Sequence, residues 1–427
     1  MNDALTYVGA GVAGLAVLCI WIRGWLFSSC IFATFLLIFS AGFAQTLFPL
    51  RFALLVFLIL ALVGLICDGA LVLSHREKVF SISFAAVSGA AYVVGQTLLD
   101  PSQSDPLFRY TLLFPIAALT GWLLARSTKH LSVSRAYVSV SIAMGLLSVF
   151  ERLSATFLVA GSYENAGRLI RDGSIRSIVF AEHPLVLSVL LICSLPFVPL
   201  AFKRRWLQMA AYATIIAGTV CTNSRGALVL VGIWILLRVV IRLGLLRSGV
   251  TRAVKASTAV VASIAFIGLM LGNGSDQLES SSALDASAEY RTALYTFAAR
   301  SLIEQPFGWG ISGLPEGTYM VASFFGTLDI SNTVDSEVAL TIFDFGWIGL
   351  LAFAVIAFGL VRPHRLSSHY GQAALLATAS GLYLAIHAWV GLGSLWWLLL
   401  GLAFGAKKSE EQLLEQGQLK KTEVDLP

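Results

Sequence analysis

The sequence has few charged residues. Asp, Glu, Lys and Arg together make up 12% of its 427 residues, whereas ordinary soluble domains carry about 25%. So few charges cannot cover a water-soluble fold of this length, which excludes a soluble enzyme, a nucleic-acid binder and a disordered scaffold. Hydrophobic residues make up 57%, enough for about a dozen membrane spans of ~20 residues each. We therefore expect a polytopic, all-α membrane protein.

Cysteine and metal-ligand patterns are also scarce. The five cysteines stand within or at the edges of apolar runs and form no C-x-x-C pair, so they are interpreted as small core residues. The sequence has no D-x-D pair and no His, Asp and Glu cluster at ligand spacing, so we expect neither a metal site nor a cofactor. No cleavable signal peptide is expected, because Asn2-Asp3 lacks basic residues.

Apolar runs separated by charged residues or by Gly and Pro predict about thirteen spans. The first and the last pair of runs are joined by very short turns, so about twelve spans are equally consistent with the pattern. The predicted spans cover residues 5–22, 25–43, 52–73, 79–98, 107–125, 136–158, 184–202, 207–222, 226–241, 254–272, 336–361, 371–387 and 393–405.

Lys and Arg gather in every second connection, from Arg76 to Lys408. The positive-inside rule puts these connections in the cytoplasm and the two long polar loops, 159–183 and 273–335, outside. The predicted organisation is therefore N-terminal spans in 1–272, an external loop in 273–335, C-terminal spans in 336–405 and a cytoplasmic tail in 406–427.

Residues 287–304 of the large loop predict an amphipathic helix, because apolar residues recur at three- and four-residue spacing. Arg291 falls inside the apolar arc, and Gln305-Pro306 ends the helix. The helix either lies on the membrane surface with Arg291 reaching the phosphate head groups, or packs on the protein and turns Arg291 toward a ligand.

The next motif, from Gly308 to Gly313, matches G-x-G-x-x-G. It follows a helix and a proline rather than a strand, so a dinucleotide site is not indicated. We interpret it as a glycine-rich turn that lets the backbone approach a ligand or the membrane domain.

Several arginines stand at predicted external positions. Arg225 opens a span, where it could bind a phosphate through its planar guanidinium or simply reach the interface. Arg168, Arg171 and Arg176 lie in the 159–183 loop, shortly before His183 at a helix start. Most of these are expected to be solvated loop charges, but one or two could line a site for an anionic ligand.

Four motifs of the C-terminal half follow one another in a characteristic order. The segment TNSRGA contains Arg225, the loop helix carries Arg291, and a Pro-Phe-Gly-Trp-Gly turn follows from Pro306. Asp335-Ser336-Glu337 then leads through an apolar helix to a G-x-x-G step within 345–350. This order resembles that of the O-antigen ligase and polysaccharide polymerase superfamily, from about Ser177 onward.

The resemblance implies glycosyl transfer at the outer face of the bacterial inner (plasma) membrane by a bundle of the GT-C type. The donor would be an oligosaccharide on undecaprenyl diphosphate. Its diphosphate is a good leaving group that arginines can stabilise without a metal. The residues matched to diphosphate binding are Arg225 and Arg291, with Arg176 added; the secondary candidates are His183, Arg171 and His387.

Asp335 departs from the ligase pattern. The ligase branch has a histidine at this position, proposed to activate the acceptor hydroxyl, and here Asp335 and Glu337 offer carboxylates instead. A carboxylate in apolar surroundings has a raised pKa and could act as the general base. Alternatively, Asp335 caps a helix that starts at Ser336.

This departure favours a polymerase that joins undecaprenyl-diphosphate-linked repeat units. The first alternative is an O-antigen ligase that transfers glycan to another acceptor. The second is a non-enzymatic transporter of lipid-linked glycan, although no predicted span carries a central charge pair. Expected partners are the lipid-linked oligosaccharide and membrane lipids, with chain-length regulator and flippase proteins as further candidates; no nucleic acid is expected.

Overall fold

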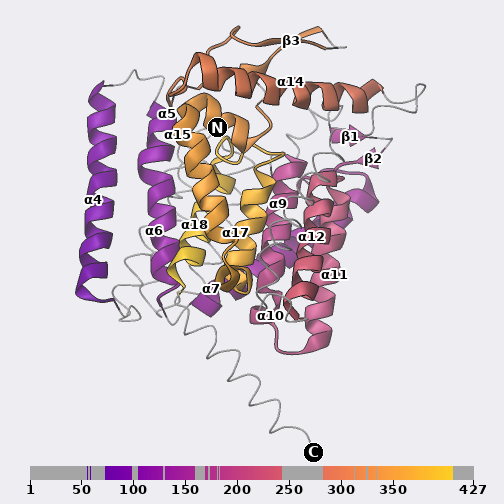
Figure 1. The fold of residues 1–427 in the computed structure, drawn as a ribbon. Helices are drawn as coiled ribbons and strands as arrows, with labels where there is room; N and C mark the ends of the chain where they lie inside the picture. The colour runs from indigo at the N-terminus through magenta and orange to yellow at the C-terminus, as the bar shows by residue number, and fades with distance from the viewer. Residues whose placement is uncertain are drawn as a thin grey trace, which may run out of the picture. The chain divides into compact units, whose positions relative to one another are not determined.

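The structure is a computed structural model and is mostly helical (Figure 1). It describes Leu55, Leu58 and residues 73–98, 104–127, 130–158, 169–171, 174–179, 181, 183–242, 282–311, 313–323, 326–332 and 334–406. The predicted spans 5–22, 25–43 and 254–272, nearly all of 52–73, and the tail after Ala406 lie outside the described residues.

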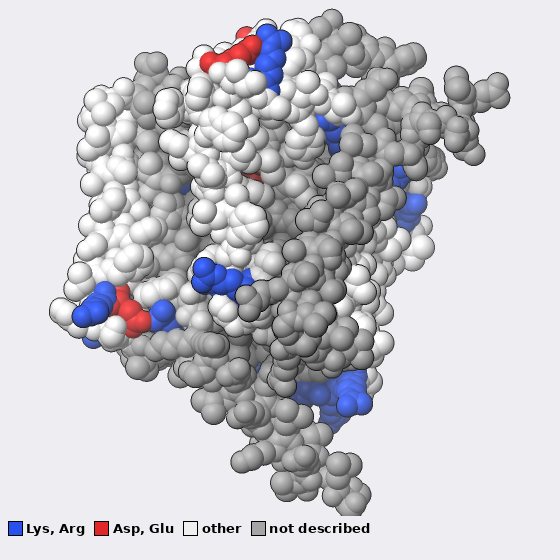
Figure 2. All heavy atoms as spheres, viewed as in Figure 1, with Lys and Arg blue, Asp and Glu red and all other residues white. Residues whose placement is uncertain are grey.

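Within the part of the chain that the structure describes, five helical segments are long and apolar enough to cross a membrane, and each coincides with a predicted span. They belong to α4 (His75–Leu98), α5 to α6 (Ser104–Leu124), α7 (His130–Ser154), α9 to α10 (Pro184–Ala201) and α15 (Glu337–Leu360). In α4 the charged residues all stand in the first turn, and the rest of its visible surface is uncharged (Figure 2). The all-α polytopic class is confirmed, while the total number of spans stays a prediction.

The remaining helices are shorter or more polar. They are α11 (Arg205–Cys221), α12 (Arg225–Arg242), α14 (Ser282–Glu304), α16 (Pro363–Leu366), α17 (His369–Ser380) and α18 (Val390–Gly405). The strands in the described residues form two antiparallel hairpins, β1 (Ile170–Arg171) with β2 (Ser174–Ile175) and β3 (Met320–Ser323) with β4 (Gly326–Asp329).

The chain forms two compact units. The first comprises Met1–Ala227, Leu360–Thr378 and His387–Pro427, and the second comprises Leu228–Gly359 and Ala379–Ile386. The division predicted from the sequence separates membrane spans, external loop and tail, whereas these two units are defined by which residues pack together. The two divisions therefore describe different properties of the chain.

Glycines bring the helices of the first unit close together. Gly121 of α6 lies against the backbone of α18, and Gly401 of α18 lies against the backbone of α6, so a Cβ on either would clash with a carbonyl oxygen. Gly145 of α7 and Gly218 of α11 likewise face each other. Close backbone approach at small residues is the usual packing mode of helices within membranes, where lipid supplies no hydrophobic drive between them.

In the second unit, α14 lies across the end of α15 (Figure 1). Leu294 and Ala298 of its apolar stripe are buried in a core with Tyr319 and Phe343. The stripe thus packs on the protein rather than lying on the membrane surface. The helix ends at Glu304 as predicted, because Pro306 follows, and it begins at Ser282, before the predicted start.

The predicted span 371–387 is interrupted. Helix α17 ends at Ser380, and residues 381–389 form turns before α18 begins. Irregular backbone at membrane depth needs polar partners within the protein. In the second unit, the Gly381 carbonyl accepts the Glu337 N–H at 2.7 Å. The broken segment therefore obtains partners that the hydropathy of the sequence does not reveal.

Helix α15 is also broken, at Gly346. This glycine has φ 56° and ψ −134°, and a Cβ there would clash with the Pro306 carbonyl. That carbonyl accepts the Trp347 N–H at 2.9 Å, in place of a partner within the helix. The left-handed conformation and the close approach explain why glycine occupies this position.

The glycine-rich turn completes the broken helix. The N–H groups of Trp309 and Gly310 donate to the carbonyls of Phe343 and Asp344, each at 2.8 Å. The break would otherwise leave these carbonyls without their helical partners. The sequence analysis expected the glycine-rich turn to bring the backbone close either to a ligand or to the membrane domain. The structure shows the backbone of this turn bonded to α15 of the membrane domain.

Candidate functional site

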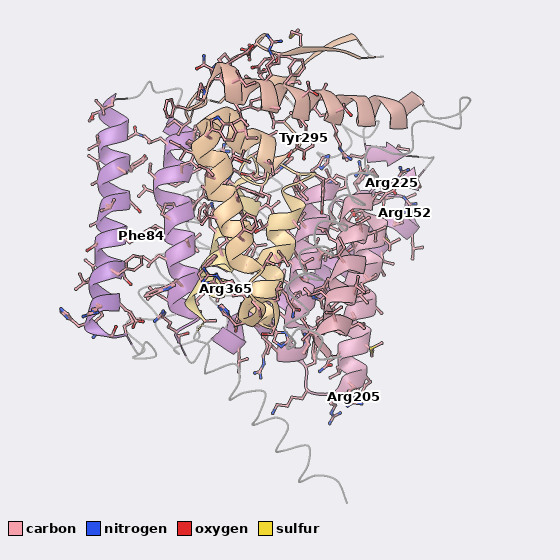
Figure 3. The ribbon with its side chains drawn as sticks, in the orientation of Figure 1. Phe84, Arg152, Arg205, Arg225, Tyr295 and Arg365 are labelled. Atoms are coloured by element: carbon pink, nitrogen blue, oxygen red, sulfur yellow. The ribbon has the colours of Figure 1, made fainter. Side chains whose placement is uncertain are left out.

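The S-R-G motif forms a tight corner between α11 and α12. Asn223 has φ 52°, a left-handed conformation that asparagine tolerates well. The Ser224 hydroxyl accepts the Ala227 N–H at 3.4 Å and caps α12. Arg225, the first residue of the helix, is exposed (Figure 3). The motif thus presents a guanidinium at a helix N-terminus, where the helix dipole favours anions.

Arg176 is held against the same corner. Its Nε donates to the Thr222 carbonyl at 3.2 Å, and the Ser177 N–H donates to the Cys221 carbonyl at 3.0 Å. These contacts fix the loop segment to the end of α11. The structure therefore brings the predicted Arg176 to the turn that carries Arg225, although 49 positions (225 − 176) separate them in the sequence.

A buried carboxylate that the sequence analysis did not single out anchors this loop segment. Glu151, near the end of α7, is fully buried. It accepts hydrogen bonds from the Ser177 hydroxyl at 2.6 Å, from the N–H groups of Ile178 and Val179 at 3.0 and 2.8 Å, and from the Leu158 N–H at 2.9 Å. The sequence signal that could have identified Glu151 is the adjacent charged pair Glu151-Arg152 toward the end of a predicted span.

Arg152, the second member of that pair, also holds the segment. Its guanidinium donates to the Ile175 carbonyl. Figure 3 labels Arg152 and Arg225 at the same end of their unit, with Arg205, which begins α11, at the other end. Arg152 and Arg176 are thus fixed through main-chain contacts.

His183 caps α9, its Nδ1 accepting the Leu185 N–H at 3.2 Å. Its ring stacks on Trp389 with the ring centroids 5.8 Å apart. Burial, and then the charge of Arg176, lower the pKa of His183 to about 4. His183 is therefore a neutral imidazole at physiological pH and adds no positive charge beside Arg176.

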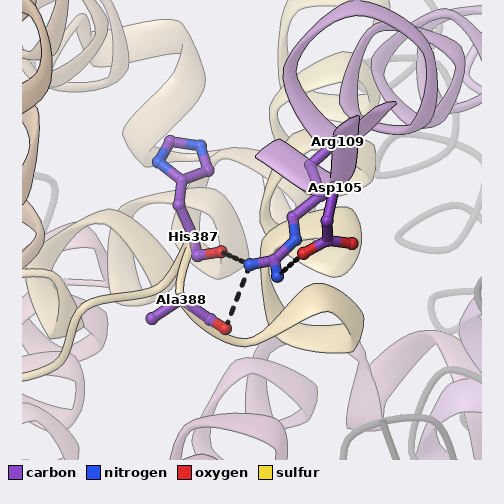
Figure 4. Close-up of polar contacts among 4 residues, drawn as sticks. All are labelled: Asp105, Arg109, His387 and Ala388. Carbon is purple, nitrogen blue, oxygen red and sulfur yellow. Dashed lines mark hydrogen bonds and ion pairs between the residues drawn. The ribbon is translucent and has the colours of Figure 1, made fainter. Parts of the chain in front are cut away.

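His387 lies in the turns between α17 and α18. Arg109 forms an ion pair with Asp105 and donates to the carbonyls of His387 and Ala388, each at 3.4 Å (Figure 4). The imidazole is buried among aromatic rings, and its Nε2 accepts the Trp397 indole N–H at 2.8 Å. These contacts indicate that His387 shapes the break between the helices.

Asp335, Tyr295 and Arg291 belong to the second unit and lie near one another. The Tyr295 hydroxyl donates to the Leu382 carbonyl at 2.7 Å and lies 3.0 Å from the Ser336 hydroxyl (Figure 3). Asp335 precedes this serine and is exposed. Its protein surroundings still desolvate the carboxyl and raise its pKa above the ordinary value, with the charge of Arg291 acting in the opposite direction.

The helix cap is Ser336 rather than Asp335. Helix α15 begins at Glu337, one residue later than predicted, and the Ser336 hydroxyl accepts the Ala339 N–H at 3.5 Å. The capping alternative for Asp335 is therefore wrong, because the neighbouring hydroxyl takes that position. Glu337 is fully buried, so of the two predicted catalytic carboxylates, Asp335 is the accessible one.

The other candidates add little. The side chain of Arg171 and the whole of Arg168 lie outside the described part of the structure. Within the described ranges no group of three or more His, Cys, Asp or Glu side chains could hold a metal ion.

These features define a multi-pass helical membrane protein with arginines and an accessible carboxylate near the ends of its helices. Residues 210–354 match the family model described as O-Antigen ligase, which spans the region from α11 to the second half of α15. The match supports the placement of the chain in the O-antigen ligase and polymerase superfamily, and thus a membrane enzyme of the glycosyl-transfer type. No curated protein matches the chain.

Proposed function

We propose that the protein is a polysaccharide polymerase of the bacterial inner membrane. It joins oligosaccharide repeat units carried on undecaprenyl diphosphate, at the outer face of the membrane. The observation that carries this proposal is the S-R-G corner, where Arg225 opens α12 in an exposed position and Arg176 is hydrogen-bonded to the same turn. Two guanidinium groups beside a helix N-terminus suit a diphosphate.

Arginines act on the donor in this proposal. Arg176 and Arg225 of the S-R-G corner bind the diphosphate and neutralise the charge that develops as it leaves. Arg291 is proposed as a further diphosphate-binding residue from the motif order of the sequence alone. Arg291 also lies near enough to Asp335 to influence its pKa. Diphosphate bound by guanidinium groups needs no metal ion for this stabilisation.

Asp335 is the general base. The acceptor hydroxyl oxygen attacks the anomeric carbon of the donor sugar, and the bond from that carbon to the phosphate oxygen breaks. Undecaprenyl diphosphate departs with the bonding electrons, while Asp335 takes the proton of the hydroxyl. Its exposure gives the acceptor access, and the desolvation that raises its pKa makes it a stronger base than an ordinary aspartate.

Purified protein in liposomes, given labelled undecaprenyl-diphosphate-linked repeat units, tests the activity. Lengthened chains support the proposal, whereas a preparation that forms no new glycosidic bond contradicts it and favours a transporter. Arg225→Lys and Arg291→Lys keep the charge but lose the planar fork, so each should reduce the rate by about 100-fold or more.

Arg300→Lys is the matched control for these variants. Arg300 lies on α14 like Arg291, but it is exposed and pairs with Glu304. This variant should keep the wild-type rate. Near-normal rates for both Arg225→Lys and Arg291→Lys would instead make these residues interface anchors.

A deletion strain separates the polymerase from the ligase. Loss of a polymerase leaves single repeat units on the acceptor lipid or removes long polymer, whereas loss of a ligase leaves complete polymer on its carrier. The aspartate in place of the ligase histidine supports the first outcome.

A further inference from the structure

The exposure of α15 changes at its break. From Ser336 to Phe345 no side chain is exposed. Immediately after Gly346 an exposed apolar stripe begins, with Trp347, Ile348, Leu351, Val355 and Phe358 between 50% and 78% exposed. Their three- and four-residue spacing places them on one face of the helix. Because α15 is apolar enough to cross a membrane, this face suits lipid, and the break marks where protein cover ends.

The exposed stripe is short for a bilayer. Eleven residue steps (358 − 347) of ~1.5 Å give about 17 Å, against a hydrocarbon thickness of about 30 Å. A short lipid-facing stretch requires either a thinner bilayer or additional apolar surface next to it. The stripe therefore needs further exposed apolar surface beside Trp347, where it begins.

The end of α14 and the turn after it supply such surface. Ile303 is 82% exposed and Phe307 is 77% exposed. Neither belongs to the buried stripe of α14, whose Leu294 and Ala298 already lie in the core. Large apolar side chains with this exposed fraction are unfavourable in water and are stabilised by contact with an apolar phase.

These residues are held next to the exposed stripe of α15. The Pro306 carbonyl, adjacent to Phe307, accepts the Trp347 N–H at 2.9 Å. Gly308 lies so close to the Asp344 carbonyl that a Cβ would clash. The surface of Ile303, Phe307 and Trp347 is thus fixed to the beginning of the lipid-facing stripe. A tryptophan at this position is typical of a membrane interface.

Charged residues lie next to Ile303 on the same helix end. Arg300 and Glu304 form an exposed ion pair, with Nε and Oε1 2.6 Å apart, and Glu304 also accepts the Tyr319 hydroxyl at 2.8 Å. Exposed apolar and charged side chains therefore lie side by side at the end of α14. Such a mixture suits a helix end at the boundary between water and hydrocarbon, where charged side chains reach the aqueous side.

We infer that Ile303, Phe307 and Trp347 form a membrane anchor whose occupant is the acyl chains of the bilayer phospholipids. The anchor continues the lipid-facing stripe of α15 and embeds the end of α14 in one leaflet. It thereby fixes the depth of α14, which carries Arg291 and Tyr295, against the bilayer. The inference concerns lipid contact and holds whatever reaction the protein catalyses.

Spin labels test the anchor in the full chain. The native cysteines are replaced by alanine, and single cysteines are introduced as Ile303→Cys and Phe307→Cys in phospholipid vesicles. Collisions with oxygen, which concentrates in hydrocarbon, are compared with collisions with a water-soluble nickel chelate. Both labels should be more accessible to oxygen than to the chelate.

Two control positions calibrate the accessibility of the spin labels to oxygen and to the chelate. Val355→Cys reports the lipid-facing stripe, and Glu316→Cys reports an exposed loop of the same unit. Labels at 303 and 307 that match Glu316→Cys would overturn the inference, and labels that match Val355→Cys would support it. Each site reports independently if one variant inserts poorly, and the readout does not depend on glycosyl transfer.

Discussion

The two units hold their candidate functional groups in different ways. In the first unit, Arg176 is fixed by main-chain hydrogen bonds around it, and these depend on the buried Glu151. In the second, Asp335 directly precedes the capping Ser336, whose hydroxyl lies 3.0 Å from that of Tyr295. The first arrangement immobilises a cation, whereas the second leaves a carboxylate exposed. In the proposed polymerase reaction, the first arrangement would bind the leaving group rigidly and the second would give the acceptor access.

The largest expected effect comes from the second unit. Asp335→Asn keeps the size of the side chain and removes the proposed base, so kcat should fall by about 100- to 10,000-fold. The KM for the lipid-linked donor should change little, because the diphosphate contacts remain. Initial rates in proteoliposomes measure both constants. Glu316→Gln, at an exposed loop position, is the control, and a near-normal kcat for Asp335→Asn would exclude it as the base.

The first unit should respond through donor binding instead. Glu151→Gln replaces one acceptor oxygen by an NH2 group that faces backbone N–H donors. Each buried donor left without an acceptor should lower the free energy of unfolding by about 1–3 kcal/mol. The melting temperature should fall and the KM for the donor should rise, because the segment carrying Arg176 loses its anchor. Thermal unfolding and donor titration are the measurements. An unchanged KM in a destabilised but active protein would limit Glu151 to a structural role.

A smaller effect is expected at the break of α15. Gly346→Ala forces an L-residue to φ 56° and brings its Cβ against the Pro306 carbonyl, so it should destabilise the protein by about 1–3 kcal/mol. Gly232→Ala is the matched control, because a Cβ on that helical glycine meets nothing within 4 Å. Thermal unfolding of the two variants compares them directly. Equal stability would mean that the break does not need glycine.

The smallest effect concerns pH. The pKa of His183 lies at about 4 in the folded protein and near 6.5 when unfolded. Between these values the unfolded chain binds more protons, so stability should decrease as the pH falls from about 7 toward 4. His183→Asn keeps a capping side chain without titrating, and its melting temperature should depend less on pH. An unchanged pH dependence would exclude this contribution.

Hydropathy and motif order predicted much of this architecture. Spans such as α4 and α15 are recognisable because most of their side chains are apolar, with the charged residues of α4 confined to its first turn. Pro306 marks the end of α14. The break after Ser380 was missed, because the partner of its Gly381 carbonyl, the Glu337 N–H, stands 44 positions away (381 − 337). Local patterns carry no information about such distant contacts.

The candidate site was predicted less completely. Arg225 stood out because an arginine opens an apolar helix, and its position at the start of α12 agrees with that expectation. Glu151 was missed because a charged pair at the end of a span resembles ordinary interfacial residues until its four donors are known. For Asp335, the sequence could not decide which of two adjacent capping residues would cap, and the structure assigns that position to Ser336.

The junction between the glycine-rich turn and α15 at Gly346 also has a mechanical consequence. Three main-chain hydrogen bonds cross between the turn and α15, two in one direction and one in the other. Pulling the end of α14 away from α15 must break them together, since each depends on the same backbone geometry. The end of α14, the turn and the middle of α15 therefore form one cooperative opening unit. We therefore expect a displacement of α15 after Gly346 to move the end of α14 as well.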